Sequence, residues 1–213
     1  MGLGHTILDQ LQPDSNVVNK GYVIYAPHFS FPTGAIKRPL TIGTFLWSGI
    51  PMLEYAQAHP EIKWVFKPHP KLKSELHEPY SGWTHEAVEK YYQDWERIAI
   101  TCYNADYPTL FKQSAAMITD CASFLLEYAV TGKPIIRLYP NELDYYPRES
   151  IKPLFEIYYS AHNRDEMFSI FASVLEKHED ATRELRLNML DKMQLIGINA
   201  SLNIVAYITQ LIK

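Results

Sequence analysis

Short apolar runs, bounded by glycine, proline and polar residues, recur over the first 140 residues of the chain. Residues 22–26 read YVIYA between Gly21 and Pro27, an aromatic and β-branched pattern typical of a buried strand. Residues 62–67 (IKWVFK) predict a second strand that ends at Pro68. The same reasoning places three further strands at residues 97–101, 115–119 and 134–139.

Helical periodicity fills the segments between these strands. We expect one helix around Ile50, Leu53 and Ala56, with Pro51 near its first turn. Further helices are expected at 83–96 with a cap at Thr84, at 106–113, at 123–131 with a stop at Gly132, and from a capping pair, Asn163 and Glu166, onward to the end of the chain. In the last of these, an apolar face comprises Met167, Ile170, Phe171, Val174 and Leu175.

Strands that alternate with helices predict an α/β fold, a Rossmann-like parallel sheet with helices on both faces. The chain has 213 residues, of which 47% are apolar and 21% charged, enough for one globular domain. We expect residues 1–20 to be an N-terminal extension and residues 21–213 to form that domain.

Charge and cysteine content narrow the possible functions. The net charge is −4 and no Lys/Arg run exceeds two residues, which argues against nucleic acid as a partner. Two cysteines, Cys102 and Cys121, cannot form a disulfide framework and fit a reducing cytoplasm. The N-terminus does not resemble a secretory signal, and polar residues interrupt the apolar tail 196–212, so any membrane contact is expected to be peripheral.

The candidate chemistry lies in three loops, 28–39, 69–77 and 120–123, which all leave the carboxyl ends of predicted strands, where ligands bind in such sheets. Asp120 to Ser123 open a helix directly after a strand, a position that suits a phosphate. In the alternative interpretation Asp120 only caps the helix and Ser123 is solvated. Glu127, four residues after Ser123, could accept ribose hydroxyl groups or could be a solvated helix residue.

His69 is a titratable donor on a loop stiffened by Pro68 and Pro70, with Lys67 and Lys71 on either side. The alternative is a surface histidine in a proline-rich turn. His69, His77 and His85 are eight residues apart, a spacing that does not match ligand patterns on one helix, so no metal is expected. The polar and aromatic loop 144–148 also follows a strand, although such loops often pack over a core without a function.

Four segments together resemble the CDP-glycerol glycerophosphotransferase family, which includes teichoic acid primases and polymerases and related capsule enzymes. The segments are YVIYAP (22–27), VFKPHP (65–70), NADYPTLFKQSAAMITDCASFLLEYAVTGKPII (104–136) and IGINASLNIVAYI (196–208). The long central block is the most specific. The resembling part of the family is its carboxyl-terminal, donor-binding domain, one half of a GT-B fold.

The resemblance implies transfer of a polyol phosphate from a CDP-activated donor, such as CDP-glycerol, to a hydroxyl acceptor on an envelope or capsule polymer or a lipid-linked acceptor, with CMP leaving. It implies that His69 contacts the donor phosphate or assists the leaving group, that Asp120 and Ser123 hold the pyrophosphate, and that Glu127 approaches the ribose. Asp144 and Arg148 match weaker family positions. Independently of the resemblance, attack on a phosphoryl centre needs charge stabilisation, so we expect Lys67 and Lys133 to complete the donor cradle. No cofactor is implied.

The chain departs from the family pattern at Ala122, where the family has a serine, and at Glu149, where it has a glycine. An acceptor-binding domain or subunit, expected to bring the catalytic base, would have to complete the cleft. His28 is only a candidate base, and the preferred interpretation is a plain loop histidine. Two other functions stay open: half of a nucleotide-sugar glycosyltransferase, and a non-catalytic binding module of polysaccharide assembly.

Overall fold

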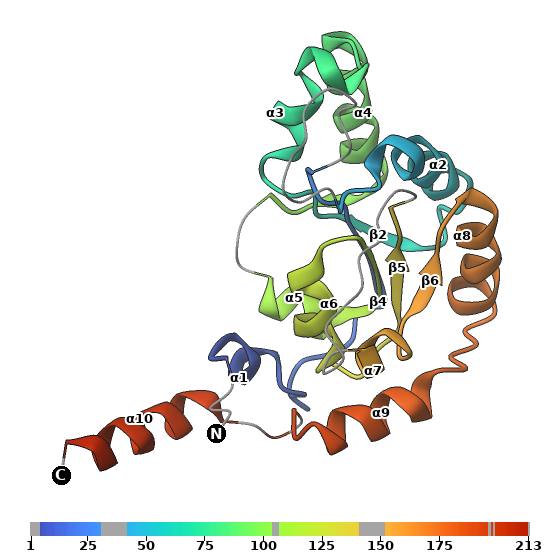
Figure 1. The fold of residues 1–213 in the computed structure, drawn as a ribbon. Helices are drawn as coiled ribbons and strands as arrows, with labels where there is room; N and C mark the ends of the chain where they lie inside the picture. The colour runs from blue at the N-terminus through green and yellow to red at the C-terminus, as the bar shows by residue number, and fades with distance from the viewer. Residues whose placement is uncertain are drawn as a thin grey trace.

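The computed structural model describes residues 5–30, 42–103, 107–140, 152–195, 197 and 199–212. Within them, six parallel strands form one sheet in the order β3-β2-β1-β4-β5-β6 (Figure 1). The strands are β1 (Tyr22–Ala26), β2 (Lys63–Phe66), β3 (Ile100–Thr101), β4 (Ser114–Thr119), β5 (Ile135–Leu138) and β6 (Tyr159–Ala161). This order is that of a Rossmann-like sheet, and it confirms the predicted fold class.

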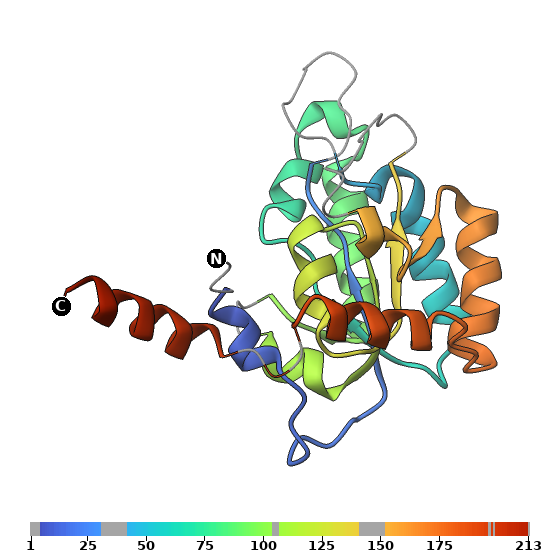
Figure 2. The same cartoon turned by 60° about the horizontal axis from the view of Figure 1, so that its bottom comes forward.

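The described residues form ten α-helices, and all of them except α10 cover one or the other face of the sheet (Figures 1 and 2). They are α1 (Ile7–Leu11), α2 (Phe45–Ala58), α3 (Leu72–Leu76), α4 (His85–Ile98), α5 (Pro108–Gln113), α6 (Ala122–Ala129), α7 (Lys152–Phe155), α8 (Arg164–Phe171), α9 (Arg183–Lys192) and α10 (Ala200–Leu211), with a 3-10 turn η1 (Pro79–Ser81) and a π-helical turn η3 (Ala172–Glu176).

Each central strand buries both of its faces, because successive side chains point to opposite sides of the sheet. On one side, Tyr25 and Phe66 pack against α2, α3, α4 and α8, where Phe66 stacks on Trp95 with ring centroids 4.8 Å apart. On the other, Ile24 and Met117 pack against α1, α5, α6, α7 and α9. Continuous apolar strands of this kind are what a sheet covered on both faces requires.

Most predicted elements are present, with boundaries shifted by a few residues. Thr84 caps α4 by accepting the Ala87 N–H at 3.2 Å, and Asn163 caps α8 by accepting the Glu166 N–H at 2.9 Å, as predicted. The third strand is shorter than predicted, because residues 97 and 98 continue α4. The short strand β6 was not predicted from the sequence at all.

The predicted start of α2, which placed Pro51 near the first turn, was wrong. The helix begins at Phe45, so Pro51 lies in its middle and Ile50 is exposed. Thr44 precedes the helix, and both its N–H and its hydroxyl donate to the Asp120 carboxylate, at 2.6 and 2.9 Å. The start of α2 is therefore set by a residue 76 positions away, which local periodicity does not reveal.

The expected N-terminal extension is packed into the folded unit, because Leu8 and Leu11 of α1 are buried in the core on the α6 side of the sheet. At the other end of the chain, α10 points away from the body in two views (Figures 1 and 2). The Asp9 carboxylate holds its start by accepting the N–H groups of Ala200 and Ser201, at 2.6 and 2.9 Å. No helix among the described residues is both long and apolar enough to cross a membrane.

Candidate functional site

A hollow of about 290 Å³ lies where β1, β2 and β4 end. Residues from all three exit loops and from α6 line it: Ala26, Pro27, His28, Lys67, Pro68, His69, Pro70, Tyr107, Cys121, Ser123 and Phe124. Three of the residues singled out in the sequence, Lys67, His69 and Ser123, thus meet in one cavity, as the strand-end argument predicts. His28, the candidate base, lines the same cavity.

The two histidines of the hollow are neighbours. Their ring centroids lie 5.0 Å apart with the rings edge to face, and the Phe29 ring lies 4.5 Å from that of His28 and 4.3 Å from that of His69. The His69 N–H donates to the Pro27 carbonyl at 2.9 Å, which ties the β2 exit loop to the β1 exit loop. The prolines and this bond hold His69 in a fixed position.

Hydrogen bonds define where each imidazole carries its proton. His69 Nδ1 accepts the Lys71 N–H at 3.1 Å, and His28 Nδ1 accepts the Ser30 N–H at 3.2 Å. Burial, and then the charge of His69, lower the pKa of His28 to about 4; burial, and then Lys71 and Lys67, lower the pKa of His69. At neutral pH both rings are therefore neutral and carry the proton on Nε2, so each can donate a hydrogen bond.

Lys67 is the buried cation of the hollow. Its ammonium nitrogen lies 5.5 Å from the centroid of the Tyr107 ring and 5.4 Å from that of Phe124, within cation–π range. Burial lowers the pKa of Lys67, against the opposing effect of Cys102 and Cys121. A partly desolvated ammonium beside two neutral imidazoles suits an anionic ligand.

Asp120 lies behind the hollow and does not line it. The residue is 5% exposed; one carboxylate oxygen accepts the His28 backbone N–H at 2.6 Å and the other accepts the Thr44 backbone N–H. Burial raises the pKa of Asp120 to about 6, although these hydrogen bonds lower it. The carboxylate joins the end of β4 to the β1 exit loop and to the start of α2, and so positions His28.

The alternative role considered for Asp120, a cap on α6, is wrong. Cys121 occupies the N-cap position of α6, without a side-chain capping bond. Ser123 is exposed in the first turn of this helix, and its Oγ lies 3.5 Å from Cys121 Sγ. Burial raises the pKa of the Cys121 thiol, so a neutral thiol and a hydroxyl line the hollow at the start of α6.

Glu127 does not line the cavity but binds a residue that does. Its Oε2 accepts the Tyr107 hydroxyl at 2.6 Å, and the Tyr107 ring in turn lines the hollow and faces Lys67. The sequence argument missed Tyr107 and Phe124, although both lie in the central block that resembles the family. In the sequence, these aromatic residues fit either core packing or the lining of a ligand cavity. Only their position in the structure shows that they line the cavity.

Lys133, which we expected in the donor cradle, does not line this hollow. It precedes β5 and so lies at the amino-terminal edge of the sheet, where its Nζ donates to the carbonyls of Phe111 and Lys112 at 2.9 and 2.5 Å. Lys133 thus provides hydrogen bonds to backbone carbonyls at the C-terminal end of α5, which have no partner within the helix. Asp144 and Arg148, the remaining predicted residues, lie outside the described residues.

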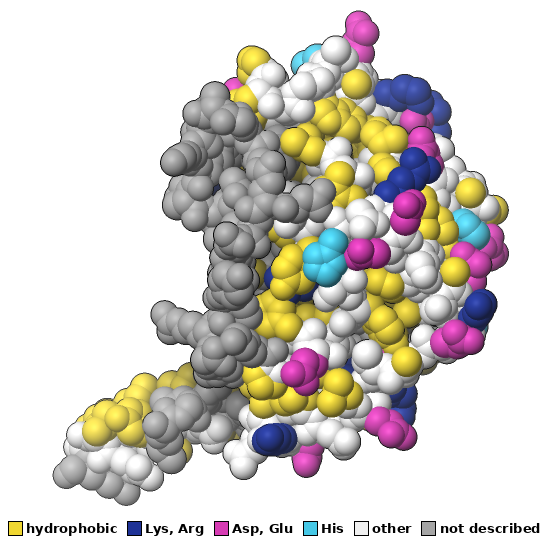
Figure 3. Space-filling model, turned by 45° about the vertical axis from the view of Figure 1, so that its right-hand side comes forward, with side chains coloured by type: hydrophobic (Ala, Val, Ile, Leu, Met, Phe, Trp, Pro, Cys, Tyr) yellow, Lys and Arg dark blue, Asp and Glu magenta, His cyan; other side chains and the backbone are white. Residues whose placement is uncertain are grey.

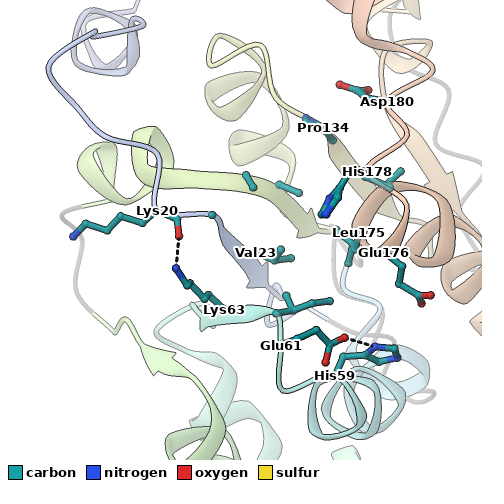
Figure 4. A pocket seen from close by; sticks show the side chains of 15 residues that line it. Lys20, Val23, His59, Glu61, Lys63, Pro134, Leu175, Glu176, His178 and Asp180 are labelled. Atoms are coloured by element: carbon teal, nitrogen blue, oxygen red, sulfur yellow. Dashed lines mark hydrogen bonds and ion pairs between the residues drawn. The ribbon is translucent and has the colours of Figure 1, made fainter.

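A larger hollow of about 580 Å³ opens at this opposite edge (Figure 4). Lys20, Glu61, Lys63 and His178 are among the side chains around it, and Lys63 Nζ donates to the Lys20 carbonyl at 3.3 Å. None of the predicted site residues lines it. Ligands of parallel α/β sheets bind at the carboxyl ends of the strands, so the smaller hollow is the better candidate.

The spacing of His69, His77 and His85 was compared with ligand patterns on one helix, whereas the structure places these three histidines on separate segments. His77 follows α3, His85 begins α4, and His69 lies apart in the hollow. Atoms of His77, His85 and Glu89 that could bind a metal all lie within 4.8 Å of one another. The chain reversal between α3 and α4 brings these groups together.

The sequence model of one protein family, described as CDP-Glycerol:Poly(glycerophosphate) glycerophosphotransferase, matches residues 38–209. No curated protein sequence is similar enough to count as a match.

Solved structures with a similar fold include a His-to-Ala variant of the wall teichoic acid polymerase TagF (TM-score 0.51, 16% identity, covering 97% of this chain and 45% of that one) and a His-to-Asn variant of TagF with CDPG (0.50, 18%, 97% and 44%). A third is UDP-GlcNAc 2-epimerase from Neisseria meningitidis bound to UDP-GlcNAc (0.48, 12%, 97% and 46%). The likeness to the two TagF structures confirms the expected α/β fold, one half of a GT-B arrangement. The chain spans less than half the length of each of the three structures.

Proposed function

The chain belongs to the CDP-glycerol glycerophosphotransferase family, and we propose on this basis that it binds the CDP-activated donor of a polyol-phosphate transferase. In the proposed reaction a hydroxyl oxygen of the acceptor attacks the phosphorus of the glycerol phosphate group. A new P–O bond forms, the P–O bond to the bridging oxygen breaks, and CMP leaves with that oxygen. The acceptor hydroxyl loses its proton to a base.

One observation carries this proposal: separate strand ends bring His69, Lys67 and Ser123 into one cavity. A diphosphate carries negative charge that increases on the leaving group as the bridge breaks, so catalysis needs positioned donors and a cation. Lys67 supplies the cation, and the His28 and His69 Nε2–H groups and the Ser123 hydroxyl supply neutral donors. At neutral pH these imidazoles are hydrogen-bond donors, which favours binding or leaving-group roles over a role as catalytic base.

We assign the other expected residues, which do not line the hollow, to supporting roles. Asp120 positions His28 through the bond to its backbone N–H, and Glu127 holds the Tyr107 hydroxyl, so neither carboxylate needs to touch the donor. Asp144 and Arg148 remain proposals for the donor loop. The volume of about 290 Å³ is at the small end for a ligand site, which suits the diphosphate, with the nucleoside extending beyond the hollow.

We further propose that an acceptor-binding domain or subunit completes the cleft, because the chain spans less than half of the structures that it matches. The apolar side chains that α10 exposes support a protein partner: Leu202, Val205, Tyr207, Ile208 and Leu211 are all exposed, and the helix at the lower left of Figure 3 carries a yellow patch along its upper side. Exposed apolar surface of this extent marks an interaction site. Cytoplasmic placement and, at most, peripheral membrane contact complete the proposal.

The test is a titration of the chain with CMP, CDP-glycerol, UMP and UDP-glucose, followed by amide chemical shifts and by thermal midpoint. We expect cytidine compounds to shift amides at residues 67–71 and 120–127 and to raise the midpoint, because a ligand stabilises the state that it binds. His69→Gln and Ser123→Ala should weaken this response. The matched control is His162→Gln, a change of an exposed histidine outside the hollow, which should leave it unchanged.

The other outcomes distinguish the alternatives. A preference for the uridine compounds at the same amides would replace the proposal by a nucleotide-sugar glycosyltransferase. Shifts at Lys20, Lys63 and His178 instead would move the donor site to the amino-terminal edge of the sheet. If none of the four ligands at millimolar concentration changes the amide chemical shifts or the thermal midpoint, a non-catalytic module is favoured.

A further inference from the structure

Two histidines and a glutamate face one another at the junction of α3 and α4. His77 Nε2 lies 3.3 Å from Glu89 Oε1, and the rings of His77 and His85 stack with centroids 4.3 Å apart. The side chain of His77 is 25% exposed and that of Glu89 36%, while His85 is open to solvent. The three groups thus surround a point that solvent ions can reach.

The local fold explains why these groups meet. His85 and Glu89 are four residues apart on α4 and so lie on one face of the helix. The turn between α3 and α4 returns the chain toward that face, with Ser81 Oγ donating to the Leu76 carbonyl at 2.6 Å and accepting the Trp83 N–H at 3.0 Å. These bonds hold the end of α3, where His77 lies, against the first turns of α4.

Protein groups alone leave this cluster incompletely satisfied. The separation of 3.3 Å between His77 Nε2 and Glu89 Oε1 is long for a charge-assisted hydrogen bond. Lys73 Nζ lies 2.9 Å from the other oxygen, Oε2, and so leaves Oε1 directed at the histidines.

We propose that His77, His85 and Glu89 bind a divalent transition-metal ion of the Zn²⁺ class. Two imidazole nitrogens and one carboxylate oxygen form a donor set that suits Zn²⁺, with water as a fourth ligand. Ligands about 2.0–2.1 Å from a tetrahedral ion lie roughly 3.3–3.4 Å apart, which matches the separation of His77 Nε2 and Glu89 Oε1. The ligand atom of His85 lies within 4.8 Å of the other two, so the His85 ring would have to turn out of its stack on His77 to enter the same geometry.

The ion would fasten α3 to α4 beside the candidate donor site. Lys73 and Tyr92, from these two helices, line a third hollow together with His69, and Lys73 Nζ lies 5.2 Å from the centroid of the Tyr92 ring. A metal that crosslinks the two helices would restrict the movement of this wall. The site is separate from the proposed donor cavity and does not depend on the proposed function.

The experiment is isothermal titration of the tag-free, metal-free chain with ZnCl₂, with Co²⁺ absorption as a report on coordination. We expect one site per chain, a higher thermal midpoint with Zn²⁺, and d–d bands of tetrahedral Co²⁺. His85→Ala and Glu89→Gln should each lower the Zn²⁺ affinity by at least about tenfold, because even residues that only orient ligands are worth this much. Lys73→Met should raise the affinity, because it removes a competing cation from Glu89.

The matched control is His162→Ala, since His162 Nδ1 lies 2.9 Å from Glu166 Oε2, four residues along the chain, in a pair that lacks a second histidine. This change should leave the Zn²⁺ affinity as it is. Equal affinity in the wild type, His85→Ala and Glu89→Gln chains would overturn the proposal, as would an octahedral Co²⁺ spectrum unaffected by both changes. Circular dichroism of each variant confirms that the comparison is made on folded protein.

Discussion

The Asp120 carboxylate accepts the backbone N–H of Thr44 at 2.6 Å, across 76 residues of sequence. This bond joins the end of β4 to the start of α2, while the second carboxylate oxygen holds the His28 N–H. One buried side chain therefore fixes the relative positions of two strand exits and a helix start. The residues that line the hollow depend on this arrangement although Asp120 itself lies behind them.

Replacement of Asp120 by Asn should destabilise the protein. The amide keeps one acceptor oxygen but places an NH₂ group against backbone N–H donors, which leaves a buried donor unsatisfied. We expect the free energy of unfolding at pH 7.5 to fall by about 1–3 kcal/mol, measured by urea denaturation. The exposed Asp191→Asn on α9 is the control and should change it by less than about 0.5 kcal/mol. Equal stability of the two variants would contradict a tie through Asp120.

The pH dependence of stability should reveal the buried His28. Its pKa is lowered to about 4 in the folded protein, so between about pH 6.5 and 4 the unfolded chain binds a proton that the native chain does not. Stability contributed by neutral His28 is thus lost as the pH falls through this window. Asp120, with its pKa raised to about 6, acts in the opposite direction, because the native state binds the extra proton there.

A comparison with His28→Gln isolates the histidine, since Asp120 is present in both proteins. The difference in unfolding free energy, wild type minus variant, should decrease when the pH is lowered from 7.5 to 5. Urea denaturation at both pH values measures it. A difference that stays constant with pH would show that His28 titrates as it does in the unfolded chain.

Lys67→Met should separate ligand binding from stability. Methionine retains an apolar stem against Tyr107 and Phe124 but removes the cation, so we expect the affinity for CDP-glycerol to fall by roughly 10-fold or more, the value of a hydrogen bond to a charged group. The thermal midpoint should change little, because burial already disfavours the charged form. The control, Lys192→Met on the exposed surface of α9, should affect neither quantity.

Arg186 should contribute strongly to stability far from the site. Its side chain is fully buried, donates to the Gly132 carbonyl and to Thr182 Oγ1, both at 3.0 Å, and pairs with Asp180. Arg186→Ala removes a fully buried side chain and with it the cationic partner of Asp180, whose side chain is only 19% exposed, a change that costs about 3–5 kcal/mol. The exposed Arg183→Ala, one turn earlier on α9, should change the unfolding free energy by less than about 0.5 kcal/mol. Chemical denaturation of the two variants tests the difference.

The apolar surface of α10 should cause the isolated chain to self-associate when no partner covers it. Sedimentation velocity should show concentration-dependent oligomers for the wild type and a monomer for Val205→Lys with Ile208→Lys, both exposed positions. The matched control carries lysine at two positions that are already polar and exposed, Asn203 and Gln210. A monomeric wild type that binds anionic vesicles would favour peripheral membrane contact over a protein partner.

The sequence by itself determined the parallel α/β architecture, four of the strands within a residue or two, and the capped starts of α4 and α8. These features depend on local patterns: apolar runs for doubly covered strands, and side chains that bond to N–H groups three residues away. The sequence also predicted that His69, Lys67 and Ser123 lie close together, because the carboxyl ends of parallel strands lie at the same edge of a sheet.

Only the tertiary structure decided which polar residues face the hollow. Asp120 turned inward to Thr44 and His28, Lys133 lay at the opposite edge of the sheet, and Tyr107 placed its ring between Glu127 and Lys67. The His77–His85–Glu89 cluster likewise exists because of a chain reversal. Partners separated by tens of residues are selected by packing, and the orientation of a side chain depends on contacts that no local pattern encodes.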